Sequence, residues 1–421
     1  MTGIHGGDRY RNRAAYDFSI NINPLGVPQE VTDALYEAVG HCSRYPDIAS
    51  EQLRQSVGAM PGVPKDALLF GNGASELLLA VVNGLKPDKT VIPAPSFYGY
   101  AYAAGAGQGE IIYYYTKREE NFGITEEICT VLTEDVDLLF LTNPGNPAGG
   151  RIQRETLLLI LKHCRKNGIA VVLDECFIEF CGGEYSMLPE LGSFENLMIL
   201  RAFTKIFAIP GVRLGYLICG SCGLYRRIER QLPEWNVSCF AQAAGAACAK
   251  QTTYIEKTAE FVRKEREFLR ERLIQAGFEV FPSEANFLLV YSRIPLYERL
   301  LEKGILIRDC ANFQGLSQGY YRIAVKTRRE NEILLAAIGG PEPDSYRFFA
   351  NRACKYFPCH KGLSDFNCLF CYCPLYPKED CPGNPRFLKR GGGYLKDCSD
   401  CTFPHRPENY DAIVRRLARK K

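Results

Sequence analysis

Residues 201–216 read RAFTKIFAIPGVRLGY and place one lysine, Lys205, on a predicted loop between two apolar runs. LMIL precedes this stretch and LGYLIC overlaps its end, and both runs are typical of buried strands. Pro210 and Gly211 interrupt the segment between them. An ordinary solvated side chain is the alternative, because lysine is mostly a surface residue. However, a loop between buried strands lies near strand ends, where α/β proteins place their sites, so Lys205 is a candidate site residue.

Similar apolar runs recur through the first 340 residues and alternate with stretches typical of amphipathic helices. The runs that we interpret as strands are TVIPAPS (90–96), VDLLFLTNP (136–144), IAVVLDE (169–175), LMILRAF (197–203) and LGYLICG (214–220). RETLLLILKHCRKNG (154–168) is typical of a helix, because it ends at Gly168 with basic residues in its last turn. Apolar strands alternating with helices predict a parallel sheet covered on both faces, with sites at the carboxyl ends of its strands.

The composition is that of an ordinary globular protein. The chain has 421 residues, 46% hydrophobic and 24% charged, which is enough for two or three domains. Its first residues lack the apolar core of a signal peptide, and no run approaches the ~18 apolar residues that a membrane helix needs. We therefore expect a cytoplasmic protein with no membrane contact. A net charge of +3 over this length gives no reason to expect a nucleic-acid partner.

Cysteine is the one unusual feature of the composition. Ten of the eighteen cysteines are scattered through residues 1–343, as expected for reduced, partly buried thiols of a cytosolic protein. The other eight all follow that point. The shift comes after GGPEPDS (339–345), so we predict a domain boundary there and a separate cysteine-rich module over residues 346–421.

Polar motifs follow several of the predicted strands. GNGASELLLAVVNGL (71–85) follows a possible strand ALLF, and its glycine-rich turn opens a helix at about Ala74 or Ser75. The N–H groups and the positive dipole end of such a helix bind anions, although Gly-Asn-Gly is also a common turn. TNPGNPAGG follows VDLLFL, and DECFIEF places Asp174 at the end of IAVVL. Lys205 follows LMIL in the same way.

One cofactor needs all of these features together. Pyridoxal 5'-phosphate requires a lysine for its aldehyde, an acid that keeps its ring nitrogen protonated, anion donors for its phosphate and an aromatic face for its ring. A lysine beside the cationic ring and Arg213 would also have a lowered pKa, which favours the free amine as nucleophile. The combination predicts a pyridoxal-phosphate site and is far more specific than any single motif.

With these motifs the chain resembles the fold-type I pyridoxal-phosphate enzymes of the aspartate aminotransferase superfamily. The resemblance implies an α/β fold in which a large domain with a mostly parallel sheet is joined to a smaller α/β domain and, here, to the cysteine-rich module. It also implies a homodimer. The expected parts are an N-terminal arm belonging to the small domain (1–29), the cofactor-binding large domain (30–235), the small domain (236–340) and the metal-binding module (346–421).

The resemblance assigns cofactor-binding roles to individual residues. It makes Lys205 the Schiff-base lysine, Asp174 the partner of the pyridine nitrogen and Asn146, in NPGNPAGG, the donor to the ring hydroxyl. The residues that match the phosphate cup are Gly73, Ala74, Ser75, Thr204 and Arg213.

Two tyrosines complete the expected cofactor site. Tyr100, which ends PSFYGY, matches the aromatic residue that stacks on the ring. Tyr45, in RYPD, matches the tyrosine that reaches the phosphate across the dimer interface. Ala202 departs from the pattern, because relatives often have a hydroxyl there, and we expect one phosphate contact to be absent.

Two branches of the superfamily compete. Histidinol-phosphate aminotransferases share RYPD and NPxNP, whereas L-threonine-O-3-phosphate decarboxylases of cobalamin biosynthesis share more, including DFSININPLG, TKIFAIPGVRLGY and GILIRDCANFQGL. Phe177 also favours the decarboxylases, because many aminotransferases have a tyrosine there. The resemblance therefore implies decarboxylation of a small phosphorylated amino acid, with transamination as the alternative. L-Threonine O-3-phosphate and L-serine O-phosphate differ by one methyl group, worth about 1 kcal/mol of burial, so both stay open as substrates.

The substrate-facing residues also come from the resemblance. Arg322, in YYRIAVK, matches the arginine that grips the substrate carboxylate, a bidentate task that suits arginine. His5 and Asn23 match positions that face the substrate in the decarboxylase branch, and a mobile surface histidine is the alternative for His5. Arg308 either holds the substrate phosphate or pairs with Asp309.

The cysteine-rich module contains C-x-x-C-x-C and a second C-x-x-C. A module with little apolar content needs cross-links in addition to its core. In a reducing cytosol a bound metal is favoured over disulfides for this purpose. Eight thiolates fit two zinc sites of four, although a histidine could replace one ligand, and an iron–sulfur cluster is the alternative. The segment resembles a cysteine-rich small domain found with cobalamin-pathway proteins. The candidate ligands are Cys354, Cys359, Cys368, Cys371, Cys373, Cys381, Cys398 and Cys401.

Two classes of function fit these features. The first is a decarboxylase with an appended metal module, and the second is a zinc-module binding protein whose enzyme-like part is an inactive scaffold. An inactive scaffold need not keep Lys205, Asp174 and Asn146 together, so the sequence favours the enzyme. The absorbance of a bound cofactor distinguishes the two.

Overall fold

The computed structural model describes residues 6–8, 10–339, 348–351, 353–363 and 366–418. The chain divides into two compact units, which we call the large unit (Met1–Ile338) and the cysteine-rich unit (Gly339–Lys421). The division falls at the start of the GGPEPDS stretch, where the cysteine content changes.

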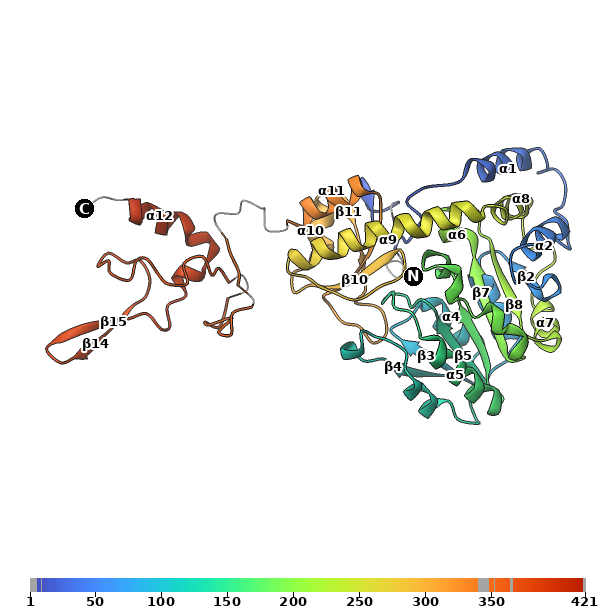
Figure 1. Cartoon of the computed structure of the whole chain (residues 1–421), viewed down its shortest axis with the longest axis horizontal. Coiled ribbons are helices and arrows are strands. Elements are labelled where there is room, and N and C mark those ends of the chain that lie inside the picture. The colour runs from blue at the N-terminus through green and yellow to red at the C-terminus, as the bar shows by residue number, and fades with distance from the viewer. Residues whose placement is uncertain (1–5, 9, 340–347, 352, 364–365, 419–421) are drawn as a thin grey trace. The chain divides into compact units, whose positions relative to one another are not determined.

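A seven-stranded sheet forms the centre of the large unit, in the order β2-β8-β7-β6-β5-β3-β4 (Figure 1). Its strands are β2 (Leu68–Gly71), β3 (Lys89–Ala94), β4 (Glu110–Tyr115), β5 (Leu138–Thr142), β6 (Ala170–Asp174), β7 (Leu197–Ala202) and β8 (Gly215–Cys219). The five strands predicted from apolar runs are confirmed. Strands β4, β3, β5, β6 and β7 run parallel to one another, as predicted.

Strand β8 departs from the predicted parallel sheet, because it runs antiparallel to both β2 and β7. The segment between β7 and β8 contains a single turn of helix, α6 (Phe203–Ile206). A parallel neighbour requires a crossover long enough to return the chain to the far end of the sheet. The short connection therefore fixes the direction of β8, which its own apolar residues do not reveal.

Helices pack around this sheet because its strands are apolar on both faces (Figure 1). The predicted helix at 154–168 is α5 (Arg154–Lys166), and Gly168, with φ +75°, follows its end. The helix expected from about residue 74 is α3, which begins at Ala74. The other helices of this part are α1 (Gln29–Val39), α2 (Glu51–Gly58), α3 (Ala74–Leu85), α4 (Tyr98–Ala106), α7 (Cys222–Glu229) and α8 (Cys239–Cys248).

A smaller α/β layer completes the large unit. Its four-stranded antiparallel sheet has the order β12-β13-β10-β9. A separate two-stranded sheet pairs the N-terminal strand β1 in parallel with β11. In this sheet Arg308 of β12 lies directly opposite Arg322 of β13. The elements are β1 (Tyr16–Asp17), α9 (Thr252–Gln275), β9 (Glu279–Val280), β10 (Phe287–Tyr291), α10 (Leu296–Glu302), β11 (Ile305–Leu306), β12 (Arg308–Asp309), β13 (Tyr320–Ala324) and α11 (Arg328–Ile338).

The cysteine-rich unit has little regular structure. Its described residues form one hairpin, β14 (Arg386–Arg390) with β15 (Gly393–Asp397), and one α-helix, α12 (Tyr410–Ala418). Among its described residues, the buried hydrophobic side chains are Phe366, Leu375, Cys401 and Ile413. So small a core supplies little stabilisation, and a unit of this kind needs additional stabilisation, such as disulfides or a bound metal.

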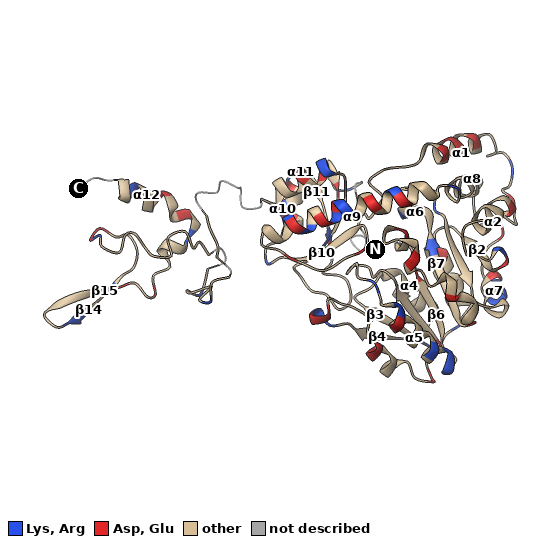
Figure 2. Cartoon of the chain, in the orientation of Figure 1, with Lys and Arg blue, Asp and Glu red and all other residues tan. Residues whose placement is uncertain are grey.

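Charged residues of both signs share the surface helices of the large unit, as α9 and α11 show in Figure 2. Helix α9 carries Glu and Arg or Lys in alternation along most of its length. In the part of the chain that the structure describes, no helix combines the length and the apolar character needed to cross a membrane.

Candidate functional site

A cavity of about 510 Å³ opens at the carboxyl ends of β5, β6 and β7. This is the edge of the sheet where α/β proteins place their sites. The predicted site residues that line the cavity are Ala74, Ser75, Tyr100, Asn146, Asp174, Thr204, Lys205, Arg213 and Arg322. The structure therefore brings together residues that are spread over more than half of the chain.

Lys205 lies in the one-turn helix α6, where the sequence predicted a loop. Burial, followed by the positive charge of Arg322, lowers the pKa of the Lys205 amine to about 8. Arg213, the neighbour anticipated from the sequence, lowers this pKa to a smaller extent. The predicted lowering is thus confirmed with a different main cause. A buried amine with this pKa is poised to act as a nucleophile and to exchange protons near neutral pH.

Asp174 ends β6 with its carboxylate directed by two hydrogen bonds. Oδ1 accepts from the backbone N–H of Cys176 at 2.9 Å, and Oδ2 accepts from the Tyr100 hydroxyl at 2.6 Å. Burial raises the pKa of Asp174, and these two hydrogen bonds act in the opposite direction. The carboxylate is therefore held in place at the cavity wall by groups that favour its charged form.

Two aromatic side chains, Tyr100 and Phe97, line the cavity close to Asp174. The Tyr100 ring is stacked on Phe140, with centroids 5.1 Å apart and planes 12° apart, and its side chain is 1% exposed. Phe97 is only partly buried and also lines the cavity. Its ring is edge-on to that of Tyr100, with the two centroids 5.6 Å apart. Because α4 begins at Tyr98, Phe97 sits at the helix entrance facing the cavity. Tyr100 thus helps to position Asp174, and Phe97 offers a second aromatic face to the cavity.

An anion cradle lies at the start of α3. Gly73 precedes the helix with φ +81°, and the helix has no side-chain cap, so its first N–H groups remain available to an anion. The positive φ of Gly73 favours glycine, and a Cβ there would also meet Nη2 of Arg213. The hydroxyl residues Ser75 and Thr204 line the same cavity, as predicted for a phosphate cup, together with Ala202.

Two buried arginines face the cavity from the smaller layer. Arg322 donates from Nη1 to Asn146 Oδ1 at 2.5 Å and from Nη2 to the Ser19 carbonyl at 2.9 Å. Its buried Nε has no hydrogen-bond partner among the described residues. Burial lowers the pKa of Arg322 to about 10 and also lowers that of Arg308, which donates to Asn312 Oδ1 at 2.7 Å. Two buried cations on one wall favour a ligand with negative charge.

Three predicted residues lie outside this arrangement. Asn23 is buried away from the cavity, and its Nδ2 donates to the Ile206 carbonyl at 2.6 Å, so it braces α6 beneath Lys205. Tyr45 is 81% exposed and packs on Trp235, with ring centroids 4.8 Å apart. His5 falls outside the residues that the structure describes.

A buried ion pair supports the site and was missed by the sequence analysis. Glu175, adjacent to Asp174, accepts a hydrogen bond from Arg201 at 2.8 Å. Glu175 is fully buried and also accepts from the Met187 backbone N–H at 2.8 Å. The pair ties the carboxyl ends of β6 and β7 together, which fixes the spacing between Asp174 and Lys205. The DE pair at the end of IAVVL was the only sequence signal.

Residues 14–338 match the family model described as aminotransferase class I and II. The chain belongs to this family. Its large unit has the fold-type I pyridoxal-phosphate fold, as the resemblance implied. Residues 345–420 match a second model, described as a cysteine-rich small domain.

Several known proteins are similar to the large unit. Threonine-phosphate decarboxylase of Salmonella typhimurium is 37% identical, over 76% of this chain and 90% of that protein. A putative threonine-phosphate decarboxylase of Caldanaerobacter subterraneus is 38% identical, over 76% and 88%. The crystal structure of histidinol-phosphate aminotransferase from Clostridium acetobutylicum superposes with a TM-score of 0.72 at 34% identity, over 77% of this chain and 98% of that chain.

The residues of the cavity fit pyridoxal phosphate, the cofactor of this fold. The anion cradle at the start of α3, which a side chain at Gly73 would fill, suits the cofactor phosphate. The carboxylate of Asp174 suits a protonated ring nitrogen. Lys205 supplies the amine, and Phe97 supplies an aromatic wall. All of these groups come from one continuous cavity surface.

The eight predicted thiol ligands of the cysteine-rich unit fall into two groups. Burial raises the pKa of the Cys359 thiol, and the neighbouring thiols of Cys371, Cys368 and Cys354 raise it further. Burial likewise raises the pKa of Cys373, to which Cys381 and Cys401 contribute. By these mutual effects on pKa we name Cys354, Cys359, Cys368 and Cys371 the first group, and Cys373, Cys381, Cys398 and Cys401 the second.

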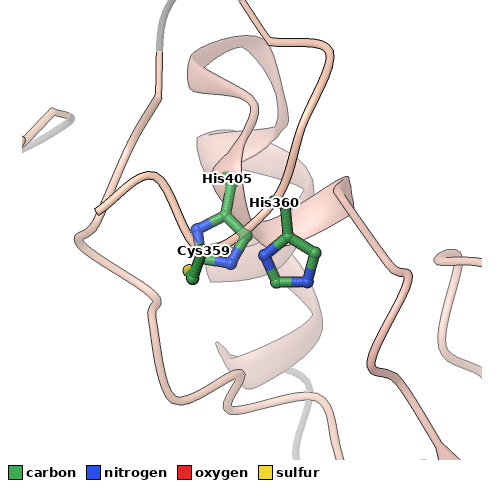
Figure 3. Close-up of side chains that lie close together, drawn as sticks. All are labelled: Cys359, His360 and His405. Carbon is green, nitrogen blue, oxygen red and sulfur yellow. The ribbon is translucent and has the colours of Figure 1, made fainter. Parts of the chain in front are cut away.

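Each group contains one tight C-x-x-C turn. The Cys371 N–H donates to the Cys368 carbonyl at 3.1 Å, and the Cys401 N–H donates to the Cys398 carbonyl at 3.0 Å. Such turns direct two thiols to one side, which suits a tetrahedral metal. Cys359 of the first group, His360 and His405 lie close together (Figure 3).

Proposed function

We propose that the large unit is a pyridoxal-phosphate-dependent carboxy-lyase that decarboxylates L-threonine O-3-phosphate, or L-serine O-phosphate, to the amino alcohol phosphate of the cobamide nucleotide loop. The observation that carries the proposal is the pair of buried arginines, Arg308 and Arg322, that line the cavity with Lys205. A substrate with a carboxylate and a phosphate matches two such cations. The names of the relatives at 37% and 38% identity support the same reaction.

Pyridoxal phosphate, when bound, supplies an electron sink for the negative charge that develops at the substrate Cα. Asp174 keeps a proton at the ring nitrogen, and Tyr100 holds Asp174 in position. Lys205, with a pKa of about 8, carries the proton that is delivered to Cα after carbon dioxide leaves. Each of these roles depends on an atom that the structure places at the cavity wall.

The two arginines decide which bond at Cα breaks. The bond that stands perpendicular to the cofactor ring is the one whose electrons reach the sink. Arg322 grips one anionic end of the substrate, and its unpartnered Nε gives it spare donor capacity for this task. Arg308, directly opposite on β12, grips the other end. Together they orient the substrate so that the carboxylate bond, and not the C–H bond, is aligned.

Histidinol-phosphate aminotransferase is the second candidate, supported by a solved relative at 34% identity. Phe177 favours the decarboxylase, because it lines the cavity with an edge-on ring packed on Phe287 at 5.2 Å and offers no hydroxyl. Supplying L-threonine O-3-phosphate, L-serine O-phosphate and histidinol phosphate with 2-oxoglutarate in separate reactions tests the choice. We expect phosphorylated amino alcohol from the first or second substrate. Faster conversion of histidinol phosphate would refute the proposal.

A homodimer forms part of this proposal. Tyr45 lies outside its own chain's cavity and exposes 81% of its surface, which suits a residue that completes a neighbouring site. Sedimentation of the full chain, with and without cofactor, tests the dimer. A monomer that retains full turnover would refute this role for Tyr45.

We further propose that the cysteine-rich unit binds about two zinc ions per chain, a number supported by two groups of four thiols. Thiolates at C-x-x-C turns and a small apolar core fit a unit that is stapled by metal. A cytoplasmic location goes with this proposal, because reducing conditions keep the thiols available. Elemental analysis of the full chain tests it, and iron with inorganic sulfide in place of zinc would contradict it.

A further inference from the structure

His405 is oriented as a metal-binding histidine would be. It is 2% exposed, and its Nδ1 lies 2.9 Å from the backbone carbonyl of Asn367. A carbonyl only accepts hydrogen bonds, so Nδ1 carries the proton and Nε2 presents a lone pair. The Asn367 N–H donates back to the His405 carbonyl at 2.9 Å, which fixes this segment further. A backbone carbonyl that sets the tautomer is the usual support of a ligating histidine.

His360 lies beside it with unsatisfied polar atoms. Both of its ring nitrogens are buried and have no hydrogen-bond partner among the described residues. Its ring centroid is 4.7 Å from that of His405. Phe366 stacks on His405 at 4.4 Å and screens the pair from water. Since a buried polar atom without a partner is costly, these nitrogens require a ligand that protein groups do not supply.

The Cys359 thiol completes a convergent set (Figure 3). One donor atom from each of Cys359, His360 and His405 lies within 4.8 Å of the other two. In a tetrahedral zinc site, Zn–S bonds of about 2.3 Å and Zn–N bonds of about 2.0–2.1 Å put ligand atoms roughly 3.5 Å apart. A small inward movement of the three side chains is therefore sufficient to coordinate one ion.

We infer that Cys359, His360 and His405 are three ligands of a mixed thiolate–imidazole zinc site, and that the Cys368–Cys371 turn provides the fourth. The sequence analysis expected eight cysteine ligands with at most one histidine replacement. The inference instead gives this site two histidines, and it does not rest on the decarboxylase reaction.

For the second group of thiols, Cys373, Cys381, Cys398 and Cys401, the inference keeps four cysteine ligands. No described histidine approaches it in the way that His360 and His405 approach the first group. A side chain at Gly383 would meet the Cys401 sulfur at 2.8 Å and the Cys381 sulfur at 3.5 Å, so the two sulfurs converge on one point of the backbone. The unit would thus hold two chemically different zinc sites.

X-ray absorption at the zinc edge of the full chain, purified with its cofactor, tests the inference directly. Zn–N and Zn–S shells separate by distance. Two nitrogens among eight ligands predict about one nitrogen for every three sulfurs. A shell of sulfur alone, iron with inorganic sulfide, or a chain that binds no metal would each overturn the inference.

Substitutions assign the nitrogen shell to these residues. The double variant His360→Ala/His405→Ala should lose the nitrogen shell and about one of two zinc ions, whereas His41→Ala, an exposed histidine of the large unit, should keep both. His405→Cys is the control for a folding defect, because a thiolate replaces the imidazole as ligand. This variant should retain both zinc ions, while the number of nitrogen ligands per chain falls by about half. An unchanged nitrogen shell in either module variant would contradict the assignment. Decarboxylation, assayed in parallel, reports separately on the large unit.

Discussion

In the large unit, Asp174 ends β6 and Lys205 follows β7, and both strands are buried. In the cysteine-rich unit, Cys359 lies in irregular chain and His405 ends a short 3-10 helix, and few apolar side chains support them. The first site is held in place by the apolar core, hydrogen bonds and a buried ion pair. The second has a small core of its own. The difference predicts that a bound cofactor completes the first site, whereas a metal ion would hold the second together.

The largest effect is expected within the rigid site. Lys205→Ala should reduce kcat by at least three orders of magnitude, since it removes both the amine that binds the cofactor and the group that protonates Cα. Borohydride treatment of the wild type should fix the cofactor to the peptide that contains Lys205, as mass spectrometry would show. Zinc content should not change. Label on another lysine would contradict the assignment, and an inactive scaffold would take up no label.

A second prediction separates the causes of the Lys205 pKa. Because burial and Arg322 lower this pKa to about 8, the amine is protonated below pH 8 and free above it. The rate at which the cofactor-free protein captures pyridoxal phosphate should therefore rise with pH and level off above about 8. In Arg322→Ala the midpoint should move to higher pH, because a neighbouring positive charge is removed. A wild-type midpoint near the usual lysine value of about 10.4 would contradict this picture.

The support of Asp174 gives a smaller effect. Tyr100→Phe removes the hydrogen bond that favours the charged carboxylate, so the pKa of Asp174 should rise further and the acidic limb of the pH–rate profile should move to higher pH. A hydrogen bond to a charged group is worth about 1.5–3 kcal/mol, which corresponds to a loss of roughly ten- to a hundredfold in kcat/KM. Tyr102→Phe, an exposed position on the same helix, is the matched control. Equal profiles for both variants would disprove the role of Tyr100.

The smallest effect tests whether the two regions are independent. Deleting residues 346–421 should leave cofactor absorbance and turnover within about twofold of the full chain, because the cavity is lined only by residues of the large unit. Chelation of the full chain should remove hydrogen-exchange protection from the cysteine-rich unit alone. A tenfold loss of turnover on deletion would show that the cysteine-rich unit contributes to catalysis.

The same contrast explains how much the sequence foretold. Asp174, Asn146 and Lys205 were found because apolar runs mark strands and the residues after them share one edge of a sheet. The antiparallel direction of β8 was not foreseen, because direction depends on the path of the connection and not on the strand's own residues. Asn23 braces Ile206, far away in the sequence, and no local pattern reports such a contact.

The roles of the aromatic residues at the cavity, and of the histidine near the thiols, were harder to predict because they also depend on how loops and turns are placed. Phe97 immediately precedes α4 and Tyr100 lies in its first turn, so both reach the cavity from one short segment and the sequence does not distinguish them. In the cysteine-rich unit, the grouping of thiols and the approach of His405 to Cys359 depend on turns with no periodic pattern. Spacing alone predicted a metal-binding module but not which residues would share an ion.

The central claim is that this cavity breaks the carboxylate bond of a phosphorylated amino acid. The most direct test is the amount of carbon dioxide released per active site from L-threonine O-3-phosphate in the absence of any 2-oxo acid. Each turnover should yield one carbon dioxide and one 1-amino-2-propanol O-2-phosphate, and release should continue for many equivalents because the cofactor returns unchanged. A single equivalent of amine transfer that stalls, with no carbon dioxide, and resumes on addition of 2-oxoglutarate would contradict the claim and identify an aminotransferase.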